Sequence, residues 1–182
     1  MKEKKMRYKH LGIICPKCFN IQYTKVSIEP DDCETCDDWI NFGKQISIEA
    51  GFMFTCSNCR RNVLAITVDA NIAEAIALLN KKGYKTKYSC GGDNCLPYIV
   101  FDESMTRYFS IIKDSAIQDR ERLILQPNDQ YGRISITWFT SVCDWGTDTI
   151  NVKEVSDAFL QFAKRLPQFK EKATYPEMTE YF

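Results

Sequence analysis

Apolar residues recur every three or four positions in two stretches of the second half of the chain. The first stretch begins with a capping box at Asn71 and ends at Gly83, and its apolar face is Ile72, Ile76 and Leu79. The second begins with Asn151 as its cap and ends before Pro167, and its apolar face is Val152, Val155, Phe159, Phe162 and Leu166. This spacing predicts two amphipathic helices whose apolar faces belong to the core.

Apolar and polar residues alternate in several shorter stretches, which predict β-strands. In the first half these are residues 11–14, 21–28, 52–55 and 63–68. In the second half they are residues 84–90, 97–101, 122–125 and 133–139, with a glycine turn at 91–94. We therefore predict an α+β fold. A β module over residues 1–67 precedes a compact α+β domain over 68–172, with an antiparallel or mixed sheet and two main helices, and a tail follows over 173–182.

Eight of the nine cysteines come in closely spaced pairs. Three of the pairs are Cys-x-x-Cys units, whose turns let two thiolates converge on one ion, and two such units complete a tetrahedral zinc site. Two knuckles separated by a hairpin are the layout of a zinc ribbon, which residues 1–67 resemble. We assign one zinc ion to Cys15, Cys18, Cys56 and Cys59.

The remaining pairs leave alternatives open. A second zinc ion would take Cys33, Cys36, Cys90 and Cys95, or Cys33 and Cys36 are free thiols on a loop. A Cys-Pro-x-Cys unit also occurs in thioredoxin-like redox proteins, but there a helix follows the motif, whereas residues 19–28 are strand-like. Cys143 stands alone beside Trp145, and we expect it to be buried as a small apolar group.

Composition excludes several classes of protein. With 182 residues, 45% of them apolar, the chain can bury a core, but it has no run of about 18 apolar residues and no signal-peptide core. Its one histidine, His10, excludes His-Glu-x-x-His zinc peptidases, and no glycine-rich phosphate loop is present. We therefore expect a cytoplasmic protein with no membrane partner, and the sequence offers no set of catalytic residues.

Charge is distributed unevenly although the chain is neutral overall. Residues 1–27 hold seven basic side chains and one acid, a balance of +6, and residues 28–49 hold seven acids and one lysine, a balance of −6. The acids predicted to face a basic protein partner are Glu29, Asp31, Asp32, Glu34, Asp37 and Asp38. The basic residues predicted to bind nucleic-acid phosphates are Lys4, Lys5, Arg7, Arg60, Arg61, Lys81, Lys82, Lys85 and Lys87. The alternative is a solvated surface whose charges neutralise each other.

The segment over residues 78–92, LLNKKGYKTKYSCGG, followed by the strand at 97–101, resembles a segment of small cysteine-rich accessory proteins of phages and prophages in Firmicutes-type bacteria. Those proteins also carry an N-terminal cysteine-knuckle module. The same pattern is similar to one in wybutosine-synthesis methyltransferase-like proteins. Members of that family continue with a histidine after the glycine, whereas Asp93 follows Gly92 here, and this difference argues against a catalytic loop.

The resemblance implies a zinc-stabilised, non-enzymatic accessory protein of a phage or mobile element that acts by binding in a bacterial host. Accessory proteins of this size include inhibitors of bacterial defence. We therefore expect an anti-CRISPR protein that binds a type II RNA-guided nuclease and also contacts DNA. One alternative is a zinc-ribbon regulator that binds DNA or RNA. Another is a methyltransferase-like, deaminase-like or redox enzyme that uses the Cys90–Cys95 loop or a Cys-x-x-Cys unit.

Overall fold

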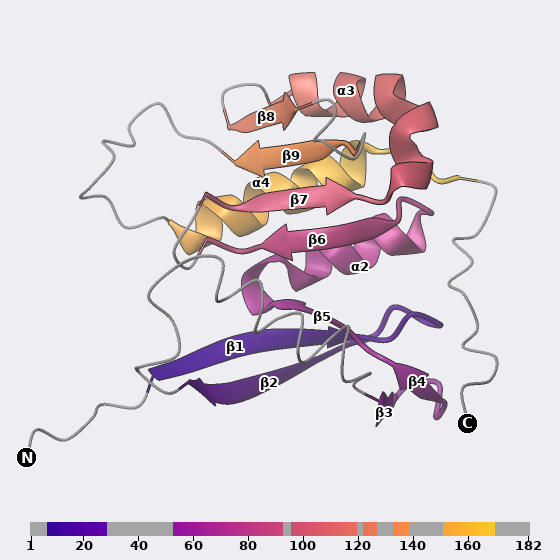
Figure 1. Cartoon of the computed structure of the whole chain (residues 1–182), viewed down its shortest axis with the longest axis vertical. Coiled ribbons are helices and arrows are strands. Elements are labelled where there is room, and N and C mark those ends of the chain that lie inside the picture. The colour runs from indigo at the N-terminus through magenta and orange to yellow at the C-terminus, as the bar shows by residue number, and fades with distance from the viewer. Residues whose placement is uncertain are drawn as a thin grey trace, which may run out of the picture.

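The computed structural model describes residues 7–28, 53–92, 96–119, 122–126, 133–138 and 151–169 (Figure 1). One three-stranded sheet has the order β2-β1-β5 and consists of β1 (Arg7–Ile14), β2 (Ile21–Ile28) and β5 (Ile66–Asp69). A small hairpin consists of β3 (Met53–Thr55) and β4 (Asn62–Leu64). A four-stranded sheet has the order β6-β7-β9-β8 and consists of β6 (Thr86–Cys90), β7 (Tyr98–Phe101), β8 (Leu123–Gln126) and β9 (Ser135–Trp138).

Three α-helices accompany these strands in the described part of the chain, and every strand pairing there is antiparallel. The helices are α2 (Ala73–Lys81), α3 (Phe109–Ile117) and α4 (Val152–Arg165). Short 3-10 segments, η2 (Ala70–Ile72) and η3 (Glu103–Tyr108), lead into α2 and α3. The predicted α+β class is therefore confirmed. No described helix combines the length and the apolar character that crossing a bilayer requires.

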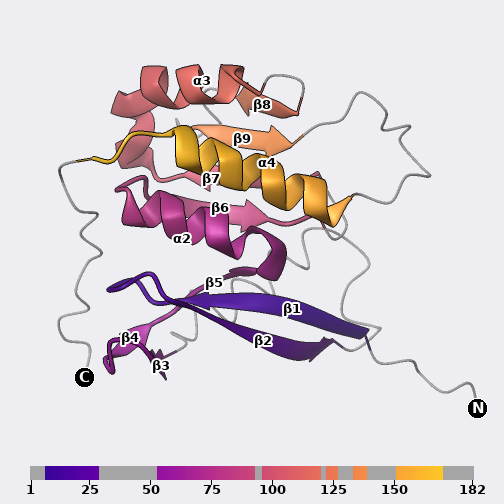
Figure 2. The same cartoon turned by 180° about the vertical axis from the view of Figure 1, so that it is seen from behind.

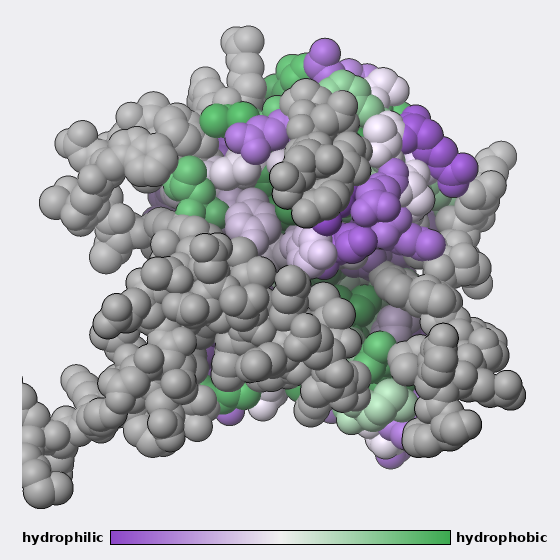
Figure 3. Space-filling view, in the orientation of Figure 1, coloured by the Kyte–Doolittle hydropathy of each residue, from purple (hydrophilic) through white to green (hydrophobic). Residues whose placement is uncertain are grey.

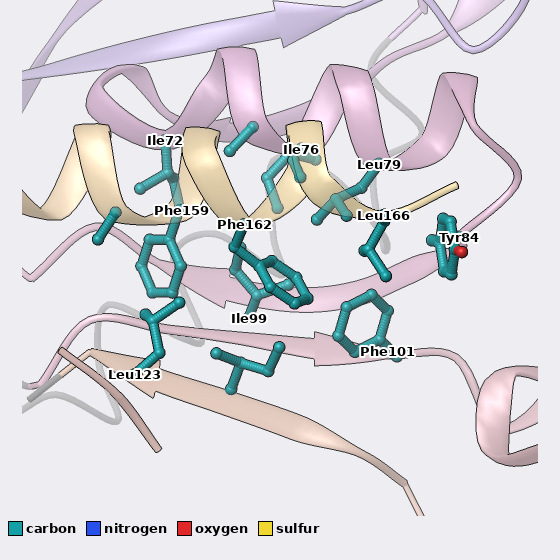
Figure 4. Packing of buried hydrophobic residues seen from close by; sticks show 14 of the residues in the cluster. Ile72, Ile76, Leu79, Tyr84, Ile99, Phe101, Leu123, Phe159, Phe162 and Leu166 are labelled. Atoms are coloured by element: carbon teal, nitrogen blue, oxygen red, sulfur yellow. The ribbon is translucent and has the colours of Figure 1, made fainter. Parts of the chain in front are cut away.

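The main core lies between the four-stranded sheet and the helices α2 and α4, which both cover the same face of that sheet (Figures 1 and 2). Figure 4 shows both aromatic rings of α4 directed toward the sheet, Phe159 toward Leu123 of β8 and Phe162 toward Ile99 of β7. Phe101 of β7 meets Phe162 edge-on, with ring centroids 6.4 Å apart. These aromatic side chains are fully buried, as are Ile76 and Leu79 of α2, as the spacing of the helices predicts. Val152, which the spacing also places on the apolar face of α4, is instead 56% exposed at the first residue of that helix.

The three-stranded sheet joins this core through α2. Gly12 of β1 lies against the helix so closely that a Cβ atom there would collide with Ala73. β1 also pairs with β5, from Ile14 opposite Ile66 to Leu11 opposite Asp69. These pairings cross the expected module boundary at residue 67, and the boundary itself stays a prediction.

Several local predictions need correction. Residues 63–68 form two strands, β4 and β5, rather than one, and a third helix, α3, is present where none was predicted. Asn71 does not cap α2, because it lies within η2 and Ile72 takes the N-cap position; its side-chain amide donates to the Gly91 carbonyl at 2.8 Å. A bulge between Thr86 and Tyr88 interrupts the expected alternation of β6. By contrast, Asn151 caps α4 as predicted, and Gly83 has the predicted positive φ of 97°.

Candidate metal centre

Four cysteine sulfurs lie together beside the three-stranded sheet. The Sγ atoms of Cys15 and Cys59 are 3.7 Å apart, and those of Cys18 and Cys56 are 3.6 Å apart. All four ligand atoms lie within 4.8 Å of one another. In a tetrahedral site with Zn–S bonds of about 2.3 Å, the sulfurs are separated by about 3.8 Å. The first predicted ligand set is thus brought together at a spacing that suits one zinc ion.

The two knuckles that supply these sulfurs have the same backbone conformation. In the first, the amide of Phe19 donates to the Cys15 carbonyl at 2.8 Å; in the second, the amide of Arg60 donates to the Cys56 carbonyl at 2.9 Å. A second bond closes each turn, because the amides of Cys15 and Cys56 donate to carbonyls five residues later. Phe19 and Arg60 both have φ of 60°, in the left-handed region. The knuckles are therefore two copies of one local structure that face each other.

Strands fix the position of each knuckle. The first connects β1 to β2, and the second connects β3 to β4. Cys15 and Cys56 are fully buried, and together with Val63 they form a small cluster separate from the main core. An ion held by all four sulfurs would therefore connect the β3–β4 hairpin to the three-stranded sheet β2-β1-β5.

The first knuckle holds two thiols with opposite shifts in pKa. Burial is the main cause that raises the pKa of Cys15 to about 12. At Cys18, burial is outweighed by hydrogen bonds from the Asn58 side chain and the Asn20 backbone, which lower the pKa of that thiol to about 6. The local hydrogen bonds thus favour the thiolate at Cys18, whereas burial disfavours it at Cys15, where the positive charge of a metal ion would offset that cost.

The arrangement does not fit the redox alternative. A thioredoxin-like site requires a helix directly after the second cysteine, because the helix N-terminus stabilises the reactive thiolate. Here the residues after Cys18 lead into β2, which is a strand. None of the five cysteines in the described residues forms a disulfide.

The other predicted ligands belong to a separate second site, of which the structure describes only Cys90. Cys90 ends β6 and is half-buried, with its sulfur accepting a hydrogen bond from the Gly92 amide at 3.4 Å. Cys33, Cys36, Cys95 and Cys143 lie outside the described residues, as do Lys4, Lys5 and the acids Glu29, Asp31, Asp32, Glu34, Asp37 and Asp38. The second zinc site and the acidic surface stay predictions.

The predicted phosphate-binding residues lie in different settings. Arg7 belongs to β1, Arg60 and Arg61 are exposed on the second knuckle, and Lys81 is exposed at the end of α2. Lys85 is half-buried, and Lys87 forms an exposed ion pair with Glu103 at 3.4 Å.

Lys82 has a structural role that its sequence position did not indicate. Its ammonium donates to the carbonyls of Ala163 and Lys164 at 2.8 Å and of Leu166 at 2.5 Å, at the C-terminus of α4. Burial lowers the pKa of this lysine. The side chain therefore caps a helix rather than facing solvent with its neighbours.

Contacts of Asp69 and Asn71 with Gly91 form a joint between the three-stranded and the four-stranded sheet, which the sequence did not predict. Asp69, at the end of β5, accepts a hydrogen bond from the Gly91 amide at 2.5 Å and forms an ion pair with Lys9 at 2.6 Å. The Asn71 amide holds the carbonyl of the same glycine. A Cβ atom on Gly91 would collide with Asn71, so only glycine fits here. The interpretation of Gly91 as a turn residue did not include this contact.

Comparisons with protein-family models, curated proteins and solved structures found no match to this chain.

Proposed function

We propose that the chain binds one Zn²⁺ ion through Cys15, Cys18, Cys56 and Cys59, and that this ion has a structural role in a binding protein. The observation that carries the proposal is the convergence of four sulfurs at tetrahedral spacing. Thiolates favour zinc over magnesium, calcium or manganese. Four cysteine ligands fill all coordination positions and leave none for water or substrate, which is typical of structural rather than catalytic zinc.

Metal analysis of the purified chain tests this proposal. We expect protein prepared without chelator to carry zinc, and the Cys56→Ser variant to lose the ion at this centre. The matched control is Cys90→Ser, which replaces a cysteine outside the cluster. Wild-type protein free of zinc after preparation in zinc-containing medium would contradict the proposal. A second zinc ion lost only in Cys90→Ser would reveal the further site that sequence pairing predicts.

In its finer form, the proposal is that the chain is a phage accessory protein that inhibits a type II RNA-guided nuclease. The support is the charge of residues 28–49, a balance of −6 in the segment that follows β2 and precedes β3. Such nucleases hold nucleic acid in positively charged channels, which an acidic segment would compete for.

A cleavage assay with the loaded nuclease tests the finer proposal. We expect excess wild-type chain to prevent target cleavage, and a variant with Asp31, Asp32, Asp37 and Asp38 all changed to Asn to lose this effect. The control is the Asp114→Asn/Asp157→Asn variant, which neutralises two exposed acids on α3 and α4. Unchanged cleavage with excess wild-type chain would refute inhibition of that nuclease and leave the zinc proposal intact.

A second candidate function is nucleic-acid binding by the zinc lobe, which consists of the two cysteine knuckles at residues 15–20 and 56–61. It is favoured by the exposed side chains of Lys17, Arg60 and Arg61 on the two knuckles. Each phosphate contact by such residues steepens the dependence of affinity on salt. We expect the Arg60→Glu/Arg61→Glu variant to bind DNA more weakly and with a shallower salt slope than wild type, and equal binding would remove this candidate.

A further inference from the structure

The four-stranded sheet has a second face, opposite the one that α2 and α4 cover (Figures 1 and 2). Ile99 and Ile136 are paired and fully buried on the helix side. Because side chains alternate along a strand, the residues that directly precede and follow Ile99 and Ile136 in sequence point to the other face. The register places two rows of side chains there: Cys90, Tyr98, Thr137 and Ile124 in one, and Tyr88, Val100, Ser135 and Gln126 in the other.

This second face combines aromatic rings with hydroxyl groups, and a buried cation lies against one of the rings. Tyr88 and Tyr98 are diagonal neighbours on adjacent strands, a relation that places side chains about 7–8 Å apart. The guanidinium of Arg133 lies over the Tyr88 ring at 5.1 Å from its centroid. The two rows and Arg133 include no carboxylate.

The polarity of the face distinguishes it from the core side. Both tyrosines, Val100, Ser135 and Thr137 are only half-buried, whereas Ile99, Phe101, Ile136 and Trp138 on the helix side of β7 and β9 are buried. Figure 3 views the molecule from the side opposite α2 and α4, and its coloured part mixes pale, weakly polar side chains with purple and green ones. A continuous apolar patch would be typical of a protein–protein contact. A mixed surface with tyrosine rings is instead suited to flat, polar, aromatic ligands.

We propose that this face binds single-stranded nucleic acid by stacking bases on Tyr88 and Tyr98. Single-stranded nucleic acid presents unstacked bases and a negative backbone, and proteins bind it by combining aromatic platforms with positive charge. The buried guanidinium of Arg133 adds positive charge next to one ring, and the half-buried hydroxyls of Ser135 and Thr137 can accept or donate hydrogen bonds at base edges. The inference deepens the nucleic-acid-binding candidate and is independent of the zinc assignment.

Fluorescence anisotropy with a labelled oligothymidylate of about 12 nucleotides tests the inference. Loss of one stacked base weakens affinity about 5- to 150-fold, and we expect this range for Tyr88→Ala and for Tyr98→Ala. Tyr88→Phe and Tyr98→Phe keep the ring and should bind within about twofold of wild type. The matched control is Tyr23→Ala, which removes an exposed tyrosine of β2 from the other sheet, and it should bind as wild type.

Several outcomes would overturn the inference. One is that wild-type protein does not bind the oligonucleotide, and another is that it binds a duplex of equal length as tightly. A third is unchanged affinity in folded, zinc-loaded Tyr88→Ala and Tyr98→Ala.

If those variants bind normally while Arg60→Glu/Arg61→Glu does not, the zinc lobe is the nucleic-acid site and the sheet face is not. If they bind normally but no longer inhibit a nuclease, the face contacts protein. Zinc content and thermal unfolding, measured on the same samples, separate failure of this inference from loss of the metal centre or of the fold.

Discussion

Arg60 and Phe19 hold the same strained position in the two knuckles, directly after the second cysteine. A left-handed conformation costs an ordinary residue about 1–2 kcal/mol, and glycine avoids this steric cost. Because Arg60 is exposed, its side chain can be removed without opening the core. We expect Arg60→Gly to raise the free energy of unfolding of the zinc-loaded protein by up to about 1 kcal/mol, measured by chemical denaturation.

Arg60→Ala separates backbone strain from the loss of the arginine side chain. Alanine keeps a Cβ atom and therefore keeps the strain, so this variant should show no gain in stability. Equal gains in both variants would show that the arginine side chain, and not the positive φ, is unfavourable. The same test cannot be made cleanly at Phe19, because its ring packs against the main core.

At the scale of single elements, α4 depends on a lysine that is far away in sequence. Lys82 follows α2 and satisfies three carbonyls at the C-terminus of α4, where the helix dipole favours a cation. Lys82→Met keeps most of the apolar stem and removes the ammonium, so we expect a loss of about 1–2 kcal/mol in the free energy of unfolding. Lys81→Met, at an exposed neighbour, should be nearly neutral in the same measurement. Equal effects of the two substitutions would contradict the capping role.

The elements predicted well are those whose signals are local. Asn151 caps α4 through its side-chain oxygen, while its amide donates to Glu154 in the first turn of the same helix. Asn71 instead lies within η2, and its side chain binds Gly91, twenty residues later in sequence. The helix α3 was missed because its residues mix polar and apolar types without a clear stripe. Its 3-10 lead-in, η3, is capped by Asp102, whose side chain accepts from the Ser104 amide, a signal that the sequence does contain.

At the scale of the whole molecule, the joint at Gly91 connects the two larger sheets. A methyl group on this glycine would collide with Asn71 and with the Cβ atom of Asp69, and the buried Asp69–Lys9 pair leaves little room for adjustment. We expect Gly91→Ala to lower the free energy of unfolding by about 1–3 kcal/mol. In the double variant Gly91→Ala/Asn71→Ala, part of the collision is relieved, so the two losses should be less than additive in a double-mutant cycle. Additive losses would mean that Asn71 does not confine the glycine.

The metal centre was predictable from the sequence, and the joint was not, for a physical reason. A Cys-x-x-Cys turn fixes the relative position of its two sulfurs within four residues. The four ligands of the site can therefore be recognised from two such turns in the sequence. The contacts of Asp69 with Lys9 and Gly91 depend on how the three-stranded and four-stranded sheets are placed relative to each other. No local residue pattern predicts that placement. The same limit applies to the tyrosine face, where the bulge in β6 sets which side chains share a side.

The two clusters of buried residues predict how the molecule responds to loss of metal. The small cluster around Cys15, Cys56 and Val63 has few apolar members, so the β3–β4 hairpin depends on the ion, whereas the main core of β7, α2 and α4 does not. Hydrogen–deuterium exchange with and without a chelator measures this difference. We expect chelation to speed exchange in residues 53–64 strongly and to leave the amides of Tyr98–Phe101 and Val152–Arg165 protected. β1 leads into the first knuckle at Ile14 and also belongs to the sheet that packs on α2. The rate of amide exchange in β1 should therefore rise only near Ile14. Uniform loss of protection would mean instead that the zinc centre and the main core unfold as one unit.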